Sequence, residues 1–534
     1  MAKNAFLSAV AKHDTYTENG AVSNSTTGDA LLDYFAKAGT FRGREQSEVD
    51  ADVSRIWGES PQIALQLLFY LRMVTRSTQG FFASEKVQKG QGARDEFRKA
   101  IAWVAKYHSE AFDQNMWLMP VVGCWKDLWH ADLIDVLDTE KVYDLVERGI
   151  ADNYNSALIA KYLPKIRSKR NTHNDRHKRL NGFARGLCAR LGWNEKQYRQ
   201  FKASGNSHGF QRSMSGGLWD QLDFSRIPGK ALFSLINHKG RDGLTTFERH
   251  GLESRYVKWL KTQPVAKFTG YVYELFKAVR GQSCWDMSPA ALSLAQKITL
   301  DKQFEGLLEL ARKDEGGIKG NVWCALDTSG SMTSEVATGV TAYDVCVSLG
   351  IYFSSLNEGA FKDNVVMFDA QSKLLKLSGS FTDKANQIMK TSTAWGNTNF
   401  QSVVDEIVRV RQTNPKIPVE DFPDTLLVVS DMQFDATGRK NTNYEEMMAK
   451  LAAVGLPNIR VIWWWVTGRC GDFPSTVEDE GVTMIGGFDG AVVTNILGGE
   501  QTVVDEKTGK TRQLNAYEQM LKALNQEVLT QIKV

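Results

Sequence analysis

The stretch Val322-Trp323-Cys324-Ala325-Leu326-Asp327-Thr328-Ser329-Gly330-Ser331 decides the fold of the second half of this chain. Its uninterrupted apolar run is typical of a strand that is buried on both faces, as the strands of parallel sheets are. In such sheets, ligands bind beyond the carboxyl ends of the strands. At that end the stretch offers one carboxylate and two hydroxyls, hard oxygen donors that suit a cation of the size of Mg²⁺.

Two later segments are predicted to end at the same edge of the sheet. Thr398 lies in Gly396-Asn397-Thr398-Asn399, directly before a helical pattern, and Asp431 follows an apolar run at residues 425–430. The sequence therefore predicts a site for one divalent cation, Mg²⁺, formed by Asp327, Ser329, Ser331, Thr398 and Asp431. Alternatively, Ser331 and Thr398 cap helices, a role that does not exclude metal binding.

Around this site, apolar runs alternate with helical patterns, which predicts a doubly wound parallel sheet of the Rossmann-like kind. The predicted strands are residues 322–327, 364–368, 374–377, 425–430, 459–466 and 482–485. The predicted helices between them are residues 342–355, 384–390, 400–410 and 444–453. A last helix is expected over residues 514–532, after a hairpin turn at residues 507–510.

The first half of the chain reads as a succession of helices. Apolar residues recur at helical spacing in residues 62–75, 97–107, 141–149, 155–162, 183–191, 254–260 and 271–279. A HEAT-like stack of antiparallel helix pairs would bury these faces, and the sequence leaves open whether the stack closes into a ring. We therefore expect an N-terminal extension (1–27), a helical-repeat domain (28–310), a charged, glycine-rich linker (311–320) and a sheet domain (321–534).

The charges of the 534-residue chain are unevenly distributed. Residues 1–320 hold 47 Lys/Arg and 36 Asp/Glu, whereas residues 321–534 hold 18 and 26. Such a split favours a polyanionic partner for the basic half, although two domains can also differ in charge by chance.

The most basic stretch is residues 161–190, with ten Lys/Arg and one acid, Asp175. Cationic side chains neutralise phosphates, and the neighbouring Tyr162, Phe183 and Trp193 could stack on unpaired bases. The alternative is a solvated basic loop between helices. We favour an RNA-binding surface, and the residues proposed for it are Lys161, Lys165, Arg167, Lys169, Arg170, Arg176, Lys178, Arg179 and Arg185.

The six cysteines and the hydropathy bear on the compartment of the protein. No two cysteines have C-x-x-C spacing, so they are expected to be small core residues in a reducing environment. No apolar run approaches the roughly 20 residues of a membrane span. We expect a protein without membrane contact in the cytoplasm, which would be that of the host if the chain is viral.

The sheet half resembles a von Willebrand factor A domain with an intact metal-ion-dependent adhesion site. Asp327, Ser329 and Ser331 match its Asp-x-Ser-x-Ser motif, Thr398 matches its threonine and Asp431 its final aspartate. The resemblance implies that these side chains hold the cation directly or through water. It also implies an open position for an acidic group of a partner protein.

The helical half, which this domain follows in the chain, is similar to Ro-like (TROVE) proteins. It is most similar to a poorly characterised branch of them found in phages and eukaryotes. The segments that carry this likeness are residues 17–35, 91–98, 123–128 and the Ser430-Asp431-Met432-Gln433-Phe434 run. The resemblance implies binding of small structured or single-stranded RNA, with Arg72, Arg76 and Lys89 as further phosphate contacts.

The leading hypothesis is thus a non-enzymatic, Ro-like RNA-binding protein whose A domain carries Mg²⁺. The alternative is an assembly scaffold that uses the metal to bind an acidic partner residue and does not bind RNA. A metal-dependent nuclease is disfavoured because the sequence offers neither a second acidic cluster nor a placed general base, and no histidine follows His250. No catalytic residue is predicted.

Overall fold

The computed structural model describes residues 13–534 except 169–170, 173, 206–208, 282–288, 392–395, 439, 470 and 505–508. The chain forms two compact units. The sheet unit comprises Met1–Arg42, Phe233–Thr245 and Glu253–Leu524, and the helical unit comprises Gly43–Leu232, Thr246–Leu252 and Asn525–Val534. Among the described residues, no helix combines the length and apolar character that a membrane crossing requires.

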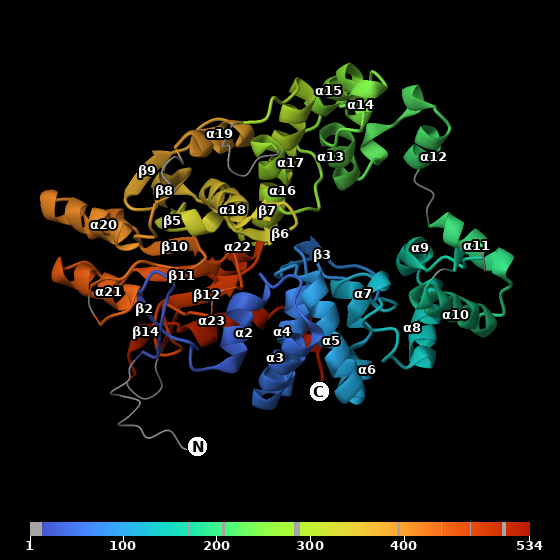
Figure 1. Ribbon diagram of the computed structural model, residues 1–534, viewed down its shortest axis with the longest axis horizontal. Coiled ribbons are helices and arrows are strands. Elements are labelled where there is room, and N and C mark those ends of the chain that lie inside the picture. Colours follow the sequence, from blue (N-terminus) through green and yellow to red (C-terminus); the bar gives the residue numbers. More distant parts are fainter. Residues whose placement is uncertain are drawn as a thin grey trace. The chain divides into compact units, whose positions relative to one another are not determined.

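The sheet unit is built on six strands in the order β12-β11-β10-β5-β8-β9 (Figure 1). They are β5 (Val322–Asp327), β8 (Asn364–Phe368), β9 (Ser372–Lys376), β10 (Thr425–Ser430), β11 (Arg460–Trp465) and β12 (Val482–Gly486). The chain proceeds from β5 in one direction along the sheet and from β10 in the other. The strand order therefore reverses between β5 and β10, which is where a doubly wound sheet binds ligands.

The sheet is mixed, which corrects the prediction of an all-parallel sheet. The strands β12, β11, β10, β5 and β8 are parallel, but β9 pairs antiparallel with β8, with Phe368 opposite Ser372. Only three residues separate these strands. A parallel crossover needs about a dozen residues or more, so this connection permits only a hairpin.

Helices cover both faces of the sheet. The helices of this unit are α2 (Ala30–Ala38), α15 (Glu253–Lys261), α16 (Val272–Arg280), α17 (Leu294–Glu315), α18 (Ala342–Leu356), α19 (Phe381–Thr391), α20 (Gln401–Thr413), α21 (Asn443–Ala453), α22 (Val492–Leu497) and α23 (Ala516–Leu524). Trp464 of β11 packs on Phe353 of α18, and the adjacent Trp463 packs on Phe400 beside α20. Successive strand residues face opposite sides, so α18 and α20 lie on opposite faces, as the continuous apolar run of β11 predicted.

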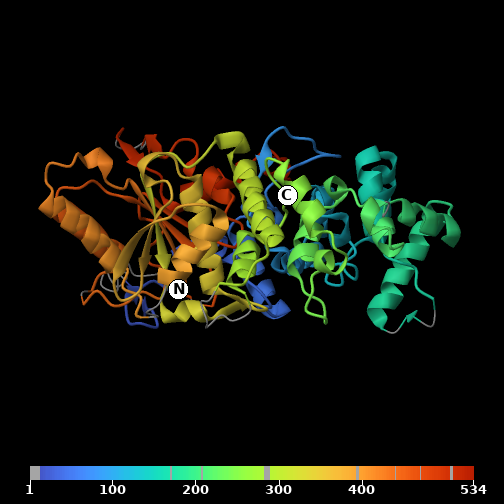
Figure 2. The same ribbon diagram turned by 90° about the horizontal axis from the view of Figure 1, so that it is seen from above.

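The two units do not follow the predicted boundary at residues 311–320. The long helix α17 continues to Glu315, and α15, α16 and α17 belong to the sheet unit, where α17 lies beside α19 (Figure 2). Phe304 of α17 stacks on Phe381 at 4.5 Å, and Arg280 of α16 forms a buried ion pair with Asp344 of α18 at 2.6 Å. These contacts bind the helices before residue 311 to the sheet.

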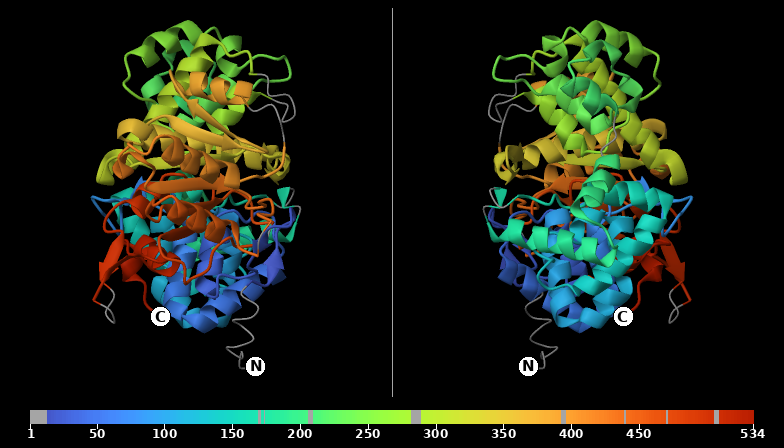
Figure 3. Two further views of the ribbon diagram at one scale, coloured as in Figure 1. Left: turned by 90° about the vertical axis from the view of Figure 1, so that its left-hand side faces the viewer. Right: turned by 90° about the vertical axis from the view of Figure 1, so that its right-hand side faces the viewer.

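The helical unit contains a succession of short helices, of which α3, α4 and α5 pack side by side (Figure 3). They are α3 (Gln46–Glu59), α4 (Pro61–Arg72), α5 (Arg94–Tyr107), α6 (Ser109–Asn115), α7 (Leu118–Val122), α8 (Thr139–Ala151), α9 (Asn153–Tyr162), α10 (Asp175–Arg190), α11 (Glu195–Ser204), α12 (Gly209–Ser215) and α14 (Thr246–Arg249). The helix α13 (Gly229–Asn237) spans the position at which the chain passes from one unit to the other.

Short antiparallel pairs complete the fold. They are β1 (Thr15–Tyr16) with β2 (Val22–Ser23), β3 (Arg76–Ser77) with β4 (Val87–Gln88), β6 (Glu335–Ala337) with β7 (Val340–Thr341), and β13 (Thr502–Val504) with β14 (Thr511–Gln513). The last pair flanks the hairpin turn predicted at residues 507–510, of which 507–508 lie outside the described residues.

The last helix is shorter than the predicted 514–532. It ends at Leu524, and a separate turn of 3-10 helix spans Leu529–Gln531. Between them, the Gln526 side chain accepts a hydrogen bond from the Lys89 N–H and donates one to the Lys89 carbonyl, both at 2.9 Å. The final residues thereby join the helical unit, where Gln62 donates to the Ile532 carbonyl at 2.9 Å.

Candidate functional site

The predicted cation site lies where the strand order reverses. Asp327 is the last residue of β5, and Asp431 directly follows β10, its neighbour in the sheet. The loop that carries Ser329 and Ser331 follows β5, and its Gly330 N–H donates to the Gly396 carbonyl at 3.3 Å. The segment before Thr398 is therefore in direct contact with this loop. The structure brings the three predicted segments together at one edge of the sheet.

A network of hydrogen bonds fixes the Asp327 carboxylate, which is fully buried. The Ser329 N–H donates to its Oδ1 at 2.9 Å, and the Ser430 hydroxyl donates to its Oδ2 at 2.5 Å. The hydroxyls of Ser329 and Ser331 lie 3.1 Å apart. Ser430 was not among the predicted site residues, although its position as the last residue of β10 was a signal for it.

The loop after β10 holds the second carboxylate. Asp431 accepts a hydrogen bond from the Gln433 N–H at 3.1 Å, and the Met432 N–H donates to the Ser430 hydroxyl at 2.8 Å. Met432 adopts a φ of 64°, a left-handed conformation that is uncommon for a residue with a side chain. This sharp turn keeps Asp431 beside the end of β10. Asp431 is buried there, with 4% of its surface exposed.

The two aspartates lie together in a buried setting that disfavours their charged forms. Burial raises the pKa of Asp327 to about 7, and the neighbouring Asp431 contributes to this shift. Burial also raises the pKa of Asp431, and the Glu18 carboxylate raises it further. Within the described residues, neither aspartate forms an ion pair with a lysine or arginine. Two buried carboxylates without a cationic side chain provide the electrostatic setting that a bound cation requires.

Thr398 joins the site through its neighbours. It is 1% exposed, and its hydroxyl accepts a hydrogen bond from the Asn19 amide at 3.2 Å. The same Asn19 Nδ2 donates to the Gln433 carbonyl at 2.6 Å. The described residues contain no cluster of three or more His, Cys, Asp or Glu side chains that could hold a metal. A cation at this edge would thus depend on the hydroxyls of Ser329, Ser331 and Thr398 in addition to the two carboxylates.

The predicted RNA surface lies on α9, α10 and the segment between them. Within it, Lys169, Arg170 and His173 are outside the described residues, and the other proposed cations are exposed. Arg179 forms an ion pair with Asp135 at 2.5 Å, and Arg185 one with Glu195 at 3.3 Å.

Some cations of this surface form ion pairs with acidic side chains, and others do not. Lys178 pairs with Asp175 at 2.8 Å on its own helix. By contrast, Lys161, Lys165, Arg167 and Arg176 form no ion pair with any acid of the described residues. Burial lowers the pKa of Lys202, and the nearby Lys165 lowers it further. The unpaired cations thus create a locally positive surface.

Of the three aromatic residues expected to stack on bases, Phe183 lies in the core. It is 6% exposed and packs against Trp129 and Tyr143, with ring centroids 5.6 Å and 5.2 Å away. Its place on the buried face of α10 explains the difference. Tyr162 and Trp193 are partly exposed.

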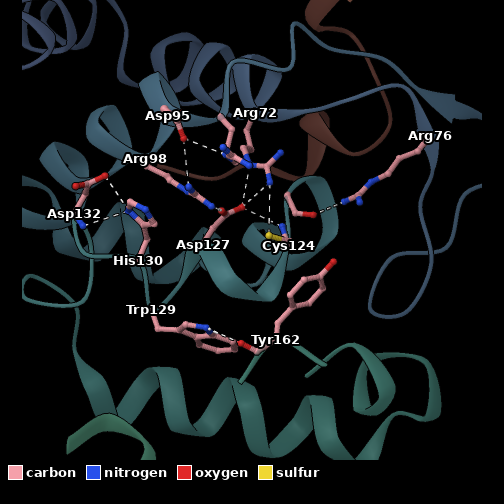
Figure 4. Close-up of polar contacts among 12 residues, drawn as sticks. Arg72, Arg76, Asp95, Arg98, Cys124, Asp127, Trp129, His130, Asp132 and Tyr162 are labelled. Carbon is pink, nitrogen blue, oxygen red and sulfur yellow. Dashed lines mark hydrogen bonds and ion pairs between the residues drawn. The ribbon is translucent and has the colours of Figure 1, made fainter. Parts of the chain in front are cut away.

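The three further phosphate contacts that the Ro-like resemblance implied make contacts within the helical unit, and Figure 4 shows those of Arg72 and Arg76. Arg72 is 7% exposed and donates to Asp127 Oδ2 at 2.9 Å. Arg76 donates to the carbonyls of Val121 and Gly123 at 2.6 Å and 2.7 Å, and Lys89 is buried. Their hydrogen bonds and burial make them structural residues of the helical unit.

Comparisons with known proteins cover both units. Residues 17–207 match the family described as Domain of unknown function (DUF2828), and residues 322–532 match Domain of unknown function (DUF7788). The chain is 24% identical over 524 residues to the uncharacterized protein L728 of Acanthamoeba polyphaga mimivirus, which covers 91% of this chain and 85% of the viral protein. The crystal structure of the Deinococcus radiodurans Ro protein (RSR) aligns with 88% of this chain and 98% of its own, at 13% identity and a TM-score of 0.42. The basic surface falls within the first family match and the candidate cation site within the second.

Proposed function

We propose that this protein is a non-enzymatic, Ro-like RNA-binding protein. Its helical unit binds small structured or single-stranded RNA, and its sheet unit, which resembles a von Willebrand A domain, holds one Mg²⁺. The observation that supports RNA binding is the set of exposed cations without an acidic partner among the described residues: Lys161, Lys165, Arg167 and Arg176. Such side chains are available to phosphates without first breaking an ion pair.

The experiment measures binding of fluorescent single-stranded and hairpin RNAs over a series of salt concentrations. Each phosphate contact contributes about 0.7 to the slope of log K against log salt for single strands. Replacing the four unpaired cations by glutamine is therefore expected to reduce that slope by about 3. The matched control replaces Lys178, Arg179 and Arg185, whose charges are already partly neutralised. It should reduce the slope by well under the value of about 2 that three full phosphate contacts would give.

Two outcomes would contradict the two parts of this proposal. Wild-type protein that does not bind either RNA at moderate salt would exclude RNA binding. Equal effects per residue of the two sets of substitutions would show that RNA binding does not depend specially on the unpaired cations. RNA that stays intact during long incubation with protein and Mg²⁺ is the expected result for a non-enzymatic protein, whereas cleavage that stops on chelation would indicate a nuclease.

The residues at the end of β5 and β10 fit Mg²⁺ because two buried carboxylates lie together without a lysine or arginine partner among the described residues. Asp327 and Asp431 would balance its charge, and the hydroxyls of Ser329, Ser331 and Thr398 would complete an oxygen-only ligand set. A bound cation would neutralise the carboxylates and attract a further acidic group. Calorimetric titration with Mg²⁺ is expected to show one site in wild type and none in Asp327→Asn.

The second candidate function is an assembly scaffold that uses the cation to bind an acidic residue of a partner protein. It is favoured by the five-member ligand set, which is one short of the six positions that Mg²⁺ prefers. Under this proposal, Asp327→Asn abolishes capture of the partner, and substitution of the four unpaired cations has no effect on it.

A further inference from the structure

An apolar cavity lies at the end of β5 that is remote from the candidate cation site. Its lining includes Trp323, the second residue of β5, whereas Asp327 is the last residue of that strand. A rise of about 3.3 Å per residue places these two positions roughly 13 Å apart. The cavity has a volume of about 380 Å³, which is in the size range of ligand-binding pockets. It is therefore a separate feature of the sheet unit.

The side chains around the cavity are mainly apolar. The helix α20 contributes Ile407 and Val410, and the strand β9 contributes Leu374. Further apolar lining residues are Trp323, Phe361 and Phe422. Leu374 is 66% exposed, although Val366, which lies opposite it on β8, is buried. An apolar side chain that entered the cavity would also cover Leu374, and removing these surfaces from water would favour its binding.

The strand that carries Leu374 is the outermost strand of the sheet (Figure 1). Because β9 pairs with β8 on one side only, about half of its main-chain N–H and C=O groups point outward. Among the described residues, no segment other than β8 forms a main-chain hydrogen bond with residues 372–376. At the other edge, by contrast, the Gly481 N–H before β12 donates to the Leu514 carbonyl at 2.9 Å. The edge beside the cavity is thus open to a further strand.

The rim of the cavity is acidic. Its wall includes part of the segment at residues 417–423, in which Glu420 and Asp421 are exposed and form no ion pair with a lysine or arginine of the described residues. Glu406 of α20 also lines the cavity, but it pairs with Arg409 at 2.5 Å. Two carboxylates without a cationic partner beside an apolar cavity favour a ligand that is both apolar and positively charged.

The charges of β9 itself disfavour a second copy of the chain as the occupant. Lys373 and Lys376 both lie on this strand, and Lys373 is 3.7 Å from Asp369. Two copies joined through β9 would bring four lysines together. Lysines on an edge strand are a common means by which proteins prevent such pairing.

We propose that the cavity and β9 bind an extended peptide of another protein, which adds to the sheet as a further strand. A bulky apolar side chain of the peptide occupies the cavity, and its main chain pairs with β9. Side chains two positions apart share a face of a strand, so a lysine or arginine at that spacing meets Asp421. This inference goes beyond the proposed function and does not depend on RNA or Mg²⁺ binding.

The first test uses the fluorescent peptide Ser-Thr-Arg-Thr-Phe-Thr-Arg-Thr-Ser, which reads the same in both directions and so suits either strand orientation. Fluorescence anisotropy measures its binding to the full chain. Three matched peptides replace the phenylalanine by serine, both arginines by glutamate, or the two threonines beside the phenylalanine by proline, which cannot donate to a strand ladder. We expect each of them to bind at least about tenfold more weakly.

The second test changes the protein at exposed positions. Leu374→Lys removes the apolar side chain of β9, Ala360→Trp introduces a large side chain at the cavity wall, and Asp421→Asn removes a rim charge. We expect the first two to weaken binding of the first peptide about tenfold, and Asp421→Asn to reduce its salt dependence. The matched control is Val504→Lys, at an exposed valine of β13, which should bind as wild type does. Thermal unfolding verifies that each variant is folded.

Hydrogen exchange of residues 372–376 reports strand addition directly, and we expect it to slow several-fold when the first peptide binds. Failure of this peptide to bind at millimolar concentration would overturn the proposal. Equal binding of the proline peptide, or unchanged exchange of β9, would refute strand addition. Wild-type affinity in both Leu374→Lys and Ala360→Trp would show that the peptide binds elsewhere, which would also overturn the proposal.

Discussion

Replacing Asp127 by asparagine should strongly destabilise the helical unit. Asp127 is fully buried and accepts hydrogen bonds from two arginines, Arg72 at 2.9 Å and Arg98 at 2.6 Å and 2.8 Å (Figure 4). The side chains of these arginines are 8% and 6% exposed. Removing one partner of a buried ion pair leaves uncompensated buried charge and costs about 3–5 kcal/mol. Because both arginines lose their partner here, we expect a loss at the upper end of that range.

The effect should depend on pH. Burial alone would raise the pKa of Asp127, but Arg72 and Arg98 outweigh it and hold the pKa below its ordinary value. A carboxyl whose folded pKa is depressed contributes stability above its unfolded pKa of about 3.9 and loses that contribution as the pH falls through the folded value. The difference in stability between wild type and Asp127→Asn is therefore full at pH 7 and shrinks below about pH 4.

Hydrogen exchange of the segment at residues 118–128 across a urea series measures the unfolding free energy of this unit. The matched control is Asp95→Asn, which also removes a carboxylate that pairs with Arg98 but whose side chain is 64% exposed. We expect it to cost less than about 1 kcal/mol. If Asp127→Asn were no more destabilising than this control at pH 7, the buried cluster would not be what stabilises the unit.

Three further substitutions or conditions test the sheet unit. Arg280→Met leaves the buried carboxylate of Asp344 without its partner and should lower the unfolding free energy by about 3–5 kcal/mol in urea denaturation. Mg²⁺ at a hundredfold excess over its Kd should stabilise the wild type by about 2.7 kcal/mol in thermal unfolding, and chelation or Asp327→Asn should remove this gain. Gly350→Ala places a Cβ 2.4 Å from the Leu326 side chain, so overpacking should cost about 1–3 kcal/mol without changing the salt dependence of RNA binding.

The strands of the sheet and the meeting of three distant loops could be predicted because they follow from local patterns. The apolar runs of β5, β8 and β10 end where a polar residue follows, so their predicted bounds agree with the structure. The direction of β9 could also have been predicted, since the predicted strands at residues 364–368 and 374–377 are separated by only five residues, too few for a parallel crossover. The extent of the sheet unit, which includes α15, α16 and α17, could not be predicted from the sequence. An amphipathic helix such as α17 shows that one of its faces is buried but does not identify the surface that covers it.

The basic surface shows a second limit of prediction from the sequence, which is that it does not reveal which cations form ion pairs. Counting lysines and arginines identifies Arg72 and Arg179 as cations but does not reveal that Asp127 and Asp135 neutralise them, because those acids lie 55 and 44 positions away. The hydrogen bond from the Glu18 N–H to the Gln433 side chain could not be predicted for the same reason, because these two residues are 415 positions apart.

Two of the segments that carry the Ro-like likeness contribute residues to the buried cluster around Asp127. Residues 91–98 supply Arg98, and residues 123–128 supply Asp127 and Gly123. A Cβ on Gly123 would lie 2.5 Å from the carboxylate of Asp127, so the glycine is required for the loop to close around it. These residues therefore stabilise the helical unit through the buried cluster. Because a cation with a buried acidic partner would lose that partner on meeting a phosphate, RNA contacts are better sought among cations that have none within the described part of the chain. Lys161, Lys165, Arg167 and Arg176 are such cations.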